Sequence, residues 1–522
     1  MKQFVYFLLS FVILFSACKK DEDITDPDES QKDPVEDVTP GDSVQTDVEE
    51  KVVPALTSFV FEASNNAQYL IKDIECTIKD SMITALIPYV TEIDELVPSF
   101  DGVYDKVSIG NTVQRSGLTT NDYSKEVVYT VSTKDTTVHY TVTVFCFTGL
   151  PIVNVETDNR QEITSKEDYV YGNMTISKTA EYSSGYQGRM RIRGRGNATF
   201  LSYPKKPYKV KLDEKASILD MPSDKEWVLL ANYCDKSLLR TSVAFKLSEM
   251  LDMYWTPRTE FVELFLNGRY MGNYLMGEHV KVSKDRLNVT DDGYLIERDG
   301  YYQQEPLYFM TQRGNPFTFK HPDTDDITQE QIDYIHNYMD EFETALYSDN
   351  FADPSTGYRK YINAESWVNW YLTNEILCNK DCNYYFFKYD NTENSKLGMS
   401  PVWDFEWSLG IGWNYTEPAR VDVLVQRGLY FDRLMQDPYF AGLVKDRWNE
   451  IKGQIPELIN YINVMAQKIE VSQQFNFKKW DILNTPVSVE VITLGDWANE
   501  VQYIKDFLVK RVEWLSSEIP NW

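Results

Sequence analysis

Apolar and polar residues alternate in several short stretches after the first fifty residues. The alternation is cleanest over 139–144, and similar runs cover 58–61, 81–88 and 127–131. A period of two indicates strands with one buried face, and short strands separated by turn residues are typical of a β-sandwich. The sequence therefore predicts an immunoglobulin-like (Ig-like) β-sandwich over residues 53–148. A spacer is the favoured role for this region, and glycan or protein binding is the alternative.

The pattern changes after residue 150. Strand-like alternation continues to about residue 299, and apolar residues then recur at the three- and four-residue spacing of helices. Amphipathic stretches of this kind include 329–346, 366–377, 439–452 and 497–519. Strands followed by helices, with few alternating strand–helix–strand units, indicate an α+β fold with a strand-rich half and a helical half.

The first residues have the layout of a bacterial lipoprotein signal. Lys2 precedes an apolar run over 4–15, and Ser16-Ala17 then lead to Cys18. The run is too short to span a bilayer as a helix. We expect a signal peptide over 1–17 and lipidation of Cys18, because several acyl chains together anchor a protein firmly.

An acidic segment follows Cys18. Residues 19–51 contain 13 acidic residues against four lysines and three prolines. This composition buries too little apolar surface to fold, so we expect a disordered tether over 18–52. The run 19–23 resembles the acidic export signal of Bacteroidetes surface lipoproteins, and a plain solvated linker is the alternative. The expected location is the outer membrane or cell surface of a Gram-negative bacterium.

Charge and composition exclude several classes of function. The 522 residues carry 52 Lys and Arg against 80 Asp and Glu, a net charge of −28, which disfavours nucleic-acid binding. There is no Walker A loop, GxSxG elbow or HExxH motif, and only four histidines. Five cysteines remain after Cys18, an odd number spread over a long chain, so we expect no disulfide framework and at least one free thiol.

A cluster of cations interrupts the acidic chain at 189–211. It contains Arg193 and Arg195 beside two glycines, and then the alternating Lys209 and Lys211. Cations with glycines that permit close backbone approach are typical of a phosphate site. An exposed basic strand paired with neighbouring acids is the alternative.

A β-hairpin is predicted over 261–280. Asn267-Gly268 lies between two alternating apolar runs, which is a strong hairpin signal. The returning strand ends at Glu278, which could orient a phosphate-binding lysine as a helix glutamate does in protein kinases. A solvated strand-end glutamate is the alternative.

Two acidic loops flank a short aromatic hairpin further along the chain. The first contains Asp381 and Asn383, and the second contains Asp404 and Glu406. Such oxygen ligands suit Mg²⁺ or Mn²⁺ rather than Zn²⁺. Taken singly these acids could cap turns, but together with the upstream cations they favour phosphoryl transfer.

Across residues 151–519 the sequence resembles the CotH kinase family, the spore-coat kinase-like proteins, in its Bacteroidetes lipoprotein form. The resemblance depends on six segments in order. They are 193–197, the Lys-Pro-Tyr strand at 206–208, 229–240, the hairpin ending in Glu278, 294–297 and 401–406. It implies an atypical kinase-like fold over 151–522 that binds ATP with a divalent metal and phosphorylates protein hydroxyls.

The resemblance also implies roles for individual residues. Asp404 matches the metal-binding aspartate and Asp381 the catalytic aspartate, and Glu278 matches the glutamate that closes the hairpin. Lys211 or Lys209 is then the phosphate lysine. Glu406 departs from the family pattern, since it replaces the more common second aspartate with a longer carboxylate that could reach metal directly or through water. Asn383 is the third candidate metal ligand.

The leading hypothesis is a lipoprotein kinase that binds ATP through Arg193, Arg195 and the lysines and acts on an unknown protein acceptor. Two alternatives remain. One is a non-catalytic glycan- or protein-binding lipoprotein with a degenerate kinase-like fold, since 35 tyrosines and 12 tryptophans offer stacking surfaces. The other is a glycosidase pair of Asp404 and Glu406, about 6.6 Å apart along an extended segment, although nothing in that chemistry requires the cations.

Overall fold

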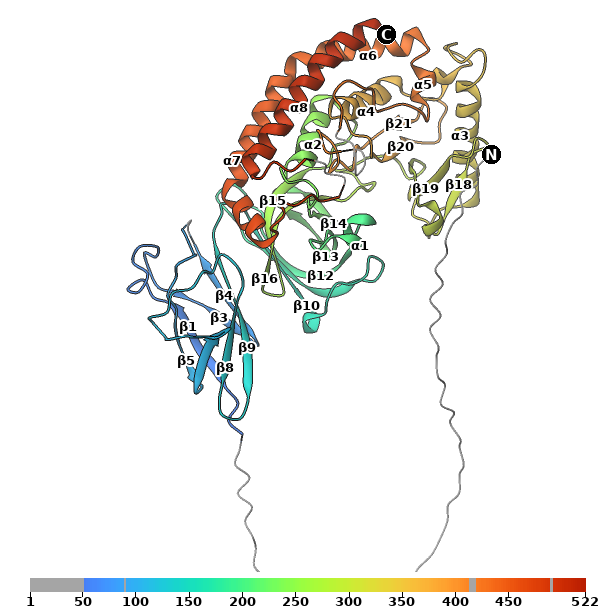
Figure 1. Cartoon of the computed structure of the whole chain (residues 1–522). Coiled ribbons are helices and arrows are strands. Elements are labelled where there is room, and N and C mark those ends of the chain that lie inside the picture. The colour runs from blue at the N-terminus through green and yellow to red at the C-terminus, as the bar shows by residue number, and fades with distance from the viewer. Residues whose placement is uncertain (1–50, 89–90, 413–418, 489–491) are drawn as a thin grey trace, which may run out of the picture. The chain divides into compact units, whose positions relative to one another are not determined.

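The computed structural model describes residues 51–522, apart from 89–90, 413–418 and 489–491 (Figure 1). Residues from Val52 to Trp522 form one compact unit. The predicted signal peptide, Cys18 and the tether up to residue 50 lie outside the described residues. None of the helices in the described ranges is long and apolar enough to cross a membrane.

The N-terminal region consists of two antiparallel-rich sheets that share one apolar core. One sheet has the order β2-β1-β5 and the other the order β3-β4-β9-β8-β6-β7. Inward-facing residues such as Phe59, Ile83 and Tyr129 are fully buried. The predicted strands are therefore present, and their bounds are β1 (Ala55–Phe61), β2 (Ile74–Glu75), β3 (Thr77–Lys79), β4 (Met82–Ile87), β5 (Ser99–Val103), β6 (Lys106–Ile109), β7 (Thr112–Val113), β8 (Val127–Ser132) and β9 (Thr137–Cys146).

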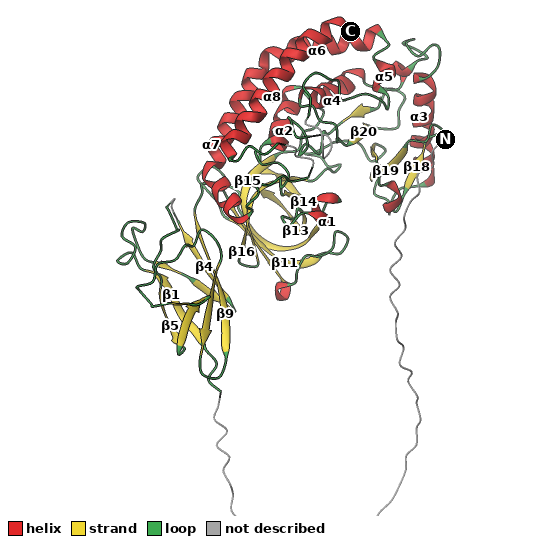
Figure 2. Ribbon diagram, viewed as in Figure 1, coloured by secondary structure: helices red, strands yellow, loops and turns green. Residues whose placement is uncertain are grey.

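A closed barrel follows, with the strand order β10-β11-β12-β13-β14-β16-β15 (Figure 2). Its interior contains Met190, Val210 and Trp227, all without exposed surface. The parallel pairing of β10 with β15 closes it. The strands are β10 (Ile152–Thr157), β11 (Val170–Ile176), β12 (Tyr186–Gly194), β13 (Tyr208–Ile218), β14 (Met221–Leu230), β15 (Thr259–Leu266) and β16 (Arg269–Glu278).

The predicted hairpin is confirmed as β15 and β16. Asn267 and Gly268 both have positive φ, 52° and 80°, as the two central residues of a tight hairpin turn require. The returning strand β16 pairs with β15 and β14, and it ends at Glu278 as predicted.

Helices and a third sheet make up the rest of the chain. The four predicted amphipathic helices are confirmed to within two residues, as α3 (Gln329–Leu346), α4 (Ala364–Ile376), α6 (Pro438–Ile451) and α8 (Trp497–Glu518). The other helices are α1 (Ala198–Ser202), α2 (Arg240–Met250), α5 (Phe431–Leu434) and α7 (Ile455–Lys479). In Figure 1, α7 and α8 lie side by side over the barrel end nearest α2.

The predicted order of a strand-rich half and a mainly helical remainder is confirmed, but more strands lie beyond residue 299 than the aromatic hairpin that was expected there. A five-stranded sheet of order β18-β19-β17-β20-β21 continues among the helices. Its strands are β17 (Tyr294–Arg298), β18 (Tyr308–Met310), β19 (Pro316–His321), β20 (Tyr384–Lys388) and β21 (Gly398–Met399). The aromatic strand that became β20 was predicted, but its place in a larger sheet was not, because the other strands are short and buried apolar runs lack alternation.

Helix α7 packs against strand β16 of the barrel. The Asn273 side chain donates to Ser472 Oγ at 2.8 Å, and the Trp480 indole donates to the Met271 carbonyl at 2.8 Å. Lys205 also joins the two elements, since its Nζ donates to the Asn273 carbonyl at 2.5 Å and to Asn476 Oδ1 at 2.9 Å. The barrel and the helical part are therefore held together by buried polar contacts as well as apolar ones.

Candidate functional site

Acidic side chains from three separate segments gather beside the sheet. Asp381 lies in the loop between α4 and β20, and Asp404 follows β21, while Glu297 lies on β17, which pairs with β20. Asn383 Nδ2 donates to Glu297 Oε1 at 2.5 Å, and Lys320 Nζ lies 3.1 Å from the other Glu297 oxygen. The two predicted loops thus meet a third carboxylate that the sequence analysis did not assign.

The backbone of Asp404 is in the left-handed conformation. Its φ is +67°, a conformation that few non-glycine residues adopt, and its carbonyl accepts a hydrogen bond of 3.0 Å from the Asn379 amide. The residue is exposed, yet protein surrounds its carboxyl on most sides. That surrounding, with the charges of Asp381 and Glu297, raises the pKa of Asp404 to about 7. The group is therefore open to a ligand and favours a cation beside it.

Glu406 lies in the same acidic neighbourhood. Burial, followed by the charges of Asp404 and Asp235, raises the pKa of Glu406 to about 8. Lys205 and Arg195 act in the opposite direction. Asp404 is thus repelled by Asp381, Glu297 and Glu406, which is the electrostatic setting of a cation site.

Arg195 is the predicted phosphate-binding residue that interacts by charge with these acids. Its guanidinium stacks on the Trp403 ring at 5.2 Å, directly before Asp404 in sequence. It interacts by charge with Asp404, Glu406 and Glu297. Lys205 is a second buried cation near Glu406, and burial lowers its pKa to about 7. The predicted phosphate residue Arg195 thus lies with the predicted metal residues.

The other predicted cations are already paired with acids. Lys209 Nζ and Lys211 Nζ lie 2.8 and 3.2 Å from the two oxygens of Glu226, and Lys209 also contacts His279 Nε2 at 3.0 Å. Arg193 stacks on the Tyr169 ring at 4.9 Å and lies 3.4 Å from Glu167. The structure gives Lys209 and Lys211 the contacts of a basic strand paired with an acid, the alternative raised above.

Glu278 is paired with arginines instead of these lysines. Its Oε2 accepts from the Arg258 backbone N–H at 3.0 Å, and its Oε1 lies 3.5 Å from Arg286 Nε. The strand register explains why Glu278 does not pair with Lys211. Glu278 lies opposite Trp227, whereas Lys211 lies opposite Glu226. Neighbouring strand residues point to opposite faces, so Glu278 and the lysines lie on different faces of the barrel sheet.

Three residues near the acids had little sequence signal. Glu297 appeared only as the last residue of the 294–297 segment that supports the resemblance, Asn379 only as the first residue of the acidic loop 379–383 with no role assigned, and Lys320 in no motif. Asn379 lies just beyond the end of α4, where its backbone carbonyl accepts from Gln426 Nε2 at 2.5 Å and its side-chain amide donates to the Asp404 carbonyl. Contacts between segments so far apart in sequence cannot be found from local pattern.

The described residues do not arrange the predicted metal ligands Asp404, Asn383 and Glu406 as an all-protein metal cage. Within the described ranges, no group of three or more His, Cys, Asp or Glu side chains is placed to hold a metal ion. Mg²⁺ in nucleotide sites commonly takes one or two carboxylates, with phosphate oxygens and water completing its shell. Asn383 donates to Glu297 through its amide nitrogen, so its oxygen remains suited to a cation.

All five cysteines in the described chain are free, as expected from their number and spacing.

Comparison with protein families gives two matches. Residues 190–515, more than half of the chain, match the family described as CotH kinase protein. Residues 58–144 match the family described as SGBP, N-terminal. No curated protein matches the chain.

Proposed function

Because the chain belongs to the CotH kinase protein family, we propose that residues 151–522 form a kinase-like domain that transfers phosphate from ATP to a protein hydroxyl. The observation that supports the proposal most is the charge interaction of Arg195 with Asp404, Glu406 and Glu297, together with that of Asp381 with Asp404. Carboxylates for a metal and a cation for phosphate are the groups that phosphoryl transfer needs in one place.

The proposed roles follow from these positions. Asp404 would hold Mg²⁺ or Mn²⁺ with Asn383 and Glu406, and the ion would neutralise charge on the phosphates. Arg195 would contact phosphate oxygens directly, and Arg193, Lys209 and Lys211 would extend the positive field. Asp381 is exposed, although the protein around its carboxyl raises its pKa, and it would accept the proton of the acceptor hydroxyl as the hydroxyl oxygen bonds to phosphorus and ADP leaves. Glu278 would position Arg286 and Arg258 at the barrel end.

ATP binding tests this proposal directly. Calorimetry on the full chain with Mg²⁺, and then with Mn²⁺, is expected to show metal-dependent binding that Asp404→Asn abolishes. Asp446→Asn is the matched control, because Asp446 is an exposed acid on α6. Metal-independent binding, or equal binding by both variants, would contradict the assignment.

We also propose that the protein is a lipoprotein anchored through Cys18 at the outer membrane or cell surface, with the acidic segment as a tether. In cells fed a labelled fatty acid, the wild-type chain is expected to take up label and enter the membrane fraction. Cys18→Ala is expected to lose both. Labelling that persists in that variant would exclude this anchor.

A non-catalytic binding protein is the second candidate. The match of residues 58–144 to the SGBP, N-terminal family supports it, as does the pair of sheets that we propose to be Ig-like. The two candidates differ in their dependence on Asp404. A binding protein would retain its ligand in Asp404→Asn, whereas a kinase would lose transfer.

A further inference from the structure

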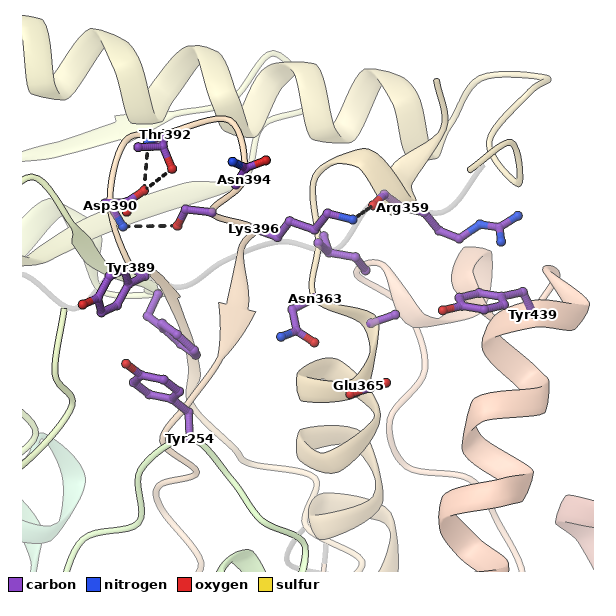
Figure 3. A pocket seen from close by; sticks show the side chains of 14 residues that line it. Tyr254, Arg359, Asn363, Glu365, Tyr389, Asp390, Thr392, Asn394, Lys396 and Tyr439 are labelled. Atoms are coloured by element: carbon purple, nitrogen blue, oxygen red, sulfur yellow. Dashed lines mark hydrogen bonds between the residues drawn. The ribbon is translucent and has the colours of Figure 1, made fainter. Parts of the chain in front are cut away.

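A separate open pocket lies at the other end of α4 from the Asp381 loop. It has a volume of about 600 Å³, within the ~300–1,000 Å³ of small-ligand sites. The start of α4, the end of β20, the loop before β21 and the start of α6 line it (Figure 3). The 13 residues of α4 span about 20 Å, so the pocket is distinct from the acidic site.

Three tyrosine rings with open surface line this pocket. Tyr254 and Tyr389 are each 46% exposed and Tyr439 is 44% exposed. Figure 3 places Tyr254 and Tyr389 on one side and Tyr439 on the other, with Asn363 and Glu365 between them. Large aromatic side chains normally bury much of their surface, so three open rings around one hollow indicate a surface kept for a ligand.

Contacts with neighbouring side chains fix the positions of two of these rings. Tyr254 stacks on Phe387 with centroids 4.4 Å apart and planes at 27°, and its hydroxyl donates to the Asn288 carbonyl at 2.6 Å. The Arg359 guanidinium covers the Tyr439 ring at 4.4 Å. A fixed ring loses little conformational entropy when a ligand stacks on it.

The positive and negative side chains that line the pocket are equal in number, and most of them bond to other groups of the protein. Lys396 Nζ donates to the Arg359 carbonyl at 2.6 Å, and Asp390 accepts from the backbone and hydroxyl of Thr392 at 2.9 and 2.6 Å. A charged ligand therefore finds no concentrated opposite charge here. The lining is close to neutral, with two cations and two anions.

Polar groups nevertheless remain for a ligand. No hydrogen bond or ion pair to another described residue engages the side chains of Glu365 and Asn394. Asn363 accepts from the Ser366 backbone through its oxygen, which leaves its two amide N–H donors for other partners. The pocket thus offers flat apolar rings together with carboxylate and amide groups.

We infer that this pocket binds a neutral oligosaccharide. A sugar ring has an apolar C–H face that stacks on a tyrosine and a rim of hydroxyls that exchange hydrogen bonds with amides and carboxylates. The absence of net charge in the lining favours an uncharged ligand over a nucleotide or an acidic peptide. This inference is independent of the proposed phosphotransfer, because it uses none of the residues assigned to that site.

Calorimetry with neutral hexasaccharides tests the inference. The panel is cellohexaose, mannohexaose, xylohexaose, laminarihexaose and maltohexaose, titrated into the full chain. We expect at least one to bind, and we expect Tyr389→Ala combined with Tyr439→Ala to lower that affinity at least tenfold. Tyr171→Ala is the control, because Tyr171 is an exposed tyrosine on barrel strand β11.

Further measurements distinguish binding at this pocket from binding at the acidic site. The unfolding midpoint of each variant shows that it is folded, and Asp404→Asn is expected to bind the sugar as wild type does. The inference is overturned if no member of the panel binds, if the double tyrosine variant binds unchanged, or if Tyr171→Ala loses affinity equally. Binding of a neutral peptide through the same tyrosines, with no sugar bound, also overturns it.

Discussion

Replacing Arg511 should destabilise the helical part strongly. Arg511 on α8 and Glu375 on α4 have no exposed surface, and Arg511 Nη2 lies 2.6 Å from Glu375 Oε2. Arg511 also donates to the carbonyls of Glu375, Val421 and Val423 at 2.9, 2.7 and 2.6 Å. One side chain thus fastens α8 to the end of α4 and to the loop before Gln426.

In Arg511→Met the Glu375 carboxylate keeps its place without its counterion. Breaking a buried ion pair from one side costs about 3–5 kcal/mol. The backbone N–H groups of Val425 and Gln426 still donate to Glu375, at 3.0 and 2.7 Å, so we expect the lower end, about 3 kcal/mol. Burial already raises the pKa of Glu375, and without Arg511 it rises further. The loss should therefore shrink from pH 8 to pH 5, as Glu375 becomes protonated in the folded state.

Urea unfolding at both pH values measures this effect. Lys510→Met, at an exposed neighbouring position on α8, is the control and should change the free energy of unfolding by less than about 0.5 kcal/mol. Adding Glu375→Gln to Arg511→Met should recover part of the loss, because no charge is then buried alone. A loss below about 1 kcal/mol, or one equal at pH 5 and pH 8, would refute the reasoning.

Three further predictions concern the barrel and its surroundings. Lysine charges and hydrogen bonds hold the pKa of Glu226 well below its usual range. The ionised Glu226 therefore stabilises the folded chain at pH 7, and this stabilisation is lost as the pH falls through the depressed pKa. In urea unfolding, the free energy that Glu226→Gln loses should thus be smaller at pH 3 than at pH 7. Trp448→Ala removes a fully buried ring from α6 and should cost about 3–5 kcal/mol, and a cost near zero would show that the site collapses. Gly268→Ala places a side chain at φ +80° and should cost about 1 kcal/mol, whereas Gly453→Ala, in open space with ordinary φ, should cost less in the same assay.

Local pattern accounts for the elements that were predicted well. Helix α3 has the predicted bounds, because its apolar residues recur at helical spacing and Thr328 caps its start with a complete capping box. The β15–β16 hairpin was found from Asn267-Gly268 between two alternating apolar runs. Barrel closure was not predicted, since the parallel pairing of β10 with β15 joins strands about a hundred residues apart and leaves no local signal.

The sequence identified residues of the candidate site, but it did not identify which residues contact one another. Asp404 and Arg195 were proposed for one site and lie within charge interaction of each other. Lys209 and Lys211 were recognised as one face of a strand, but their partner Glu226 belongs to the neighbouring strand, and register is not visible in one strand's alternation. Glu297 could have been found only through the family segment, because a single glutamate in a buried strand has no pattern of its own.

Helix α4 joins the tyrosine-lined pocket at its start to the Asn379 contact with Asp404 just beyond its end. Each residue of an α-helix adds about 1.5 Å of length and about 100° of rotation. A single insertion or deletion within α4 would therefore turn Asn379 and Asp381 away from Asp404, even if every side chain kept its identity. The length of this helix, counted in whole residues, is thus a requirement of the acidic site in the same way as the identity of its carboxylates.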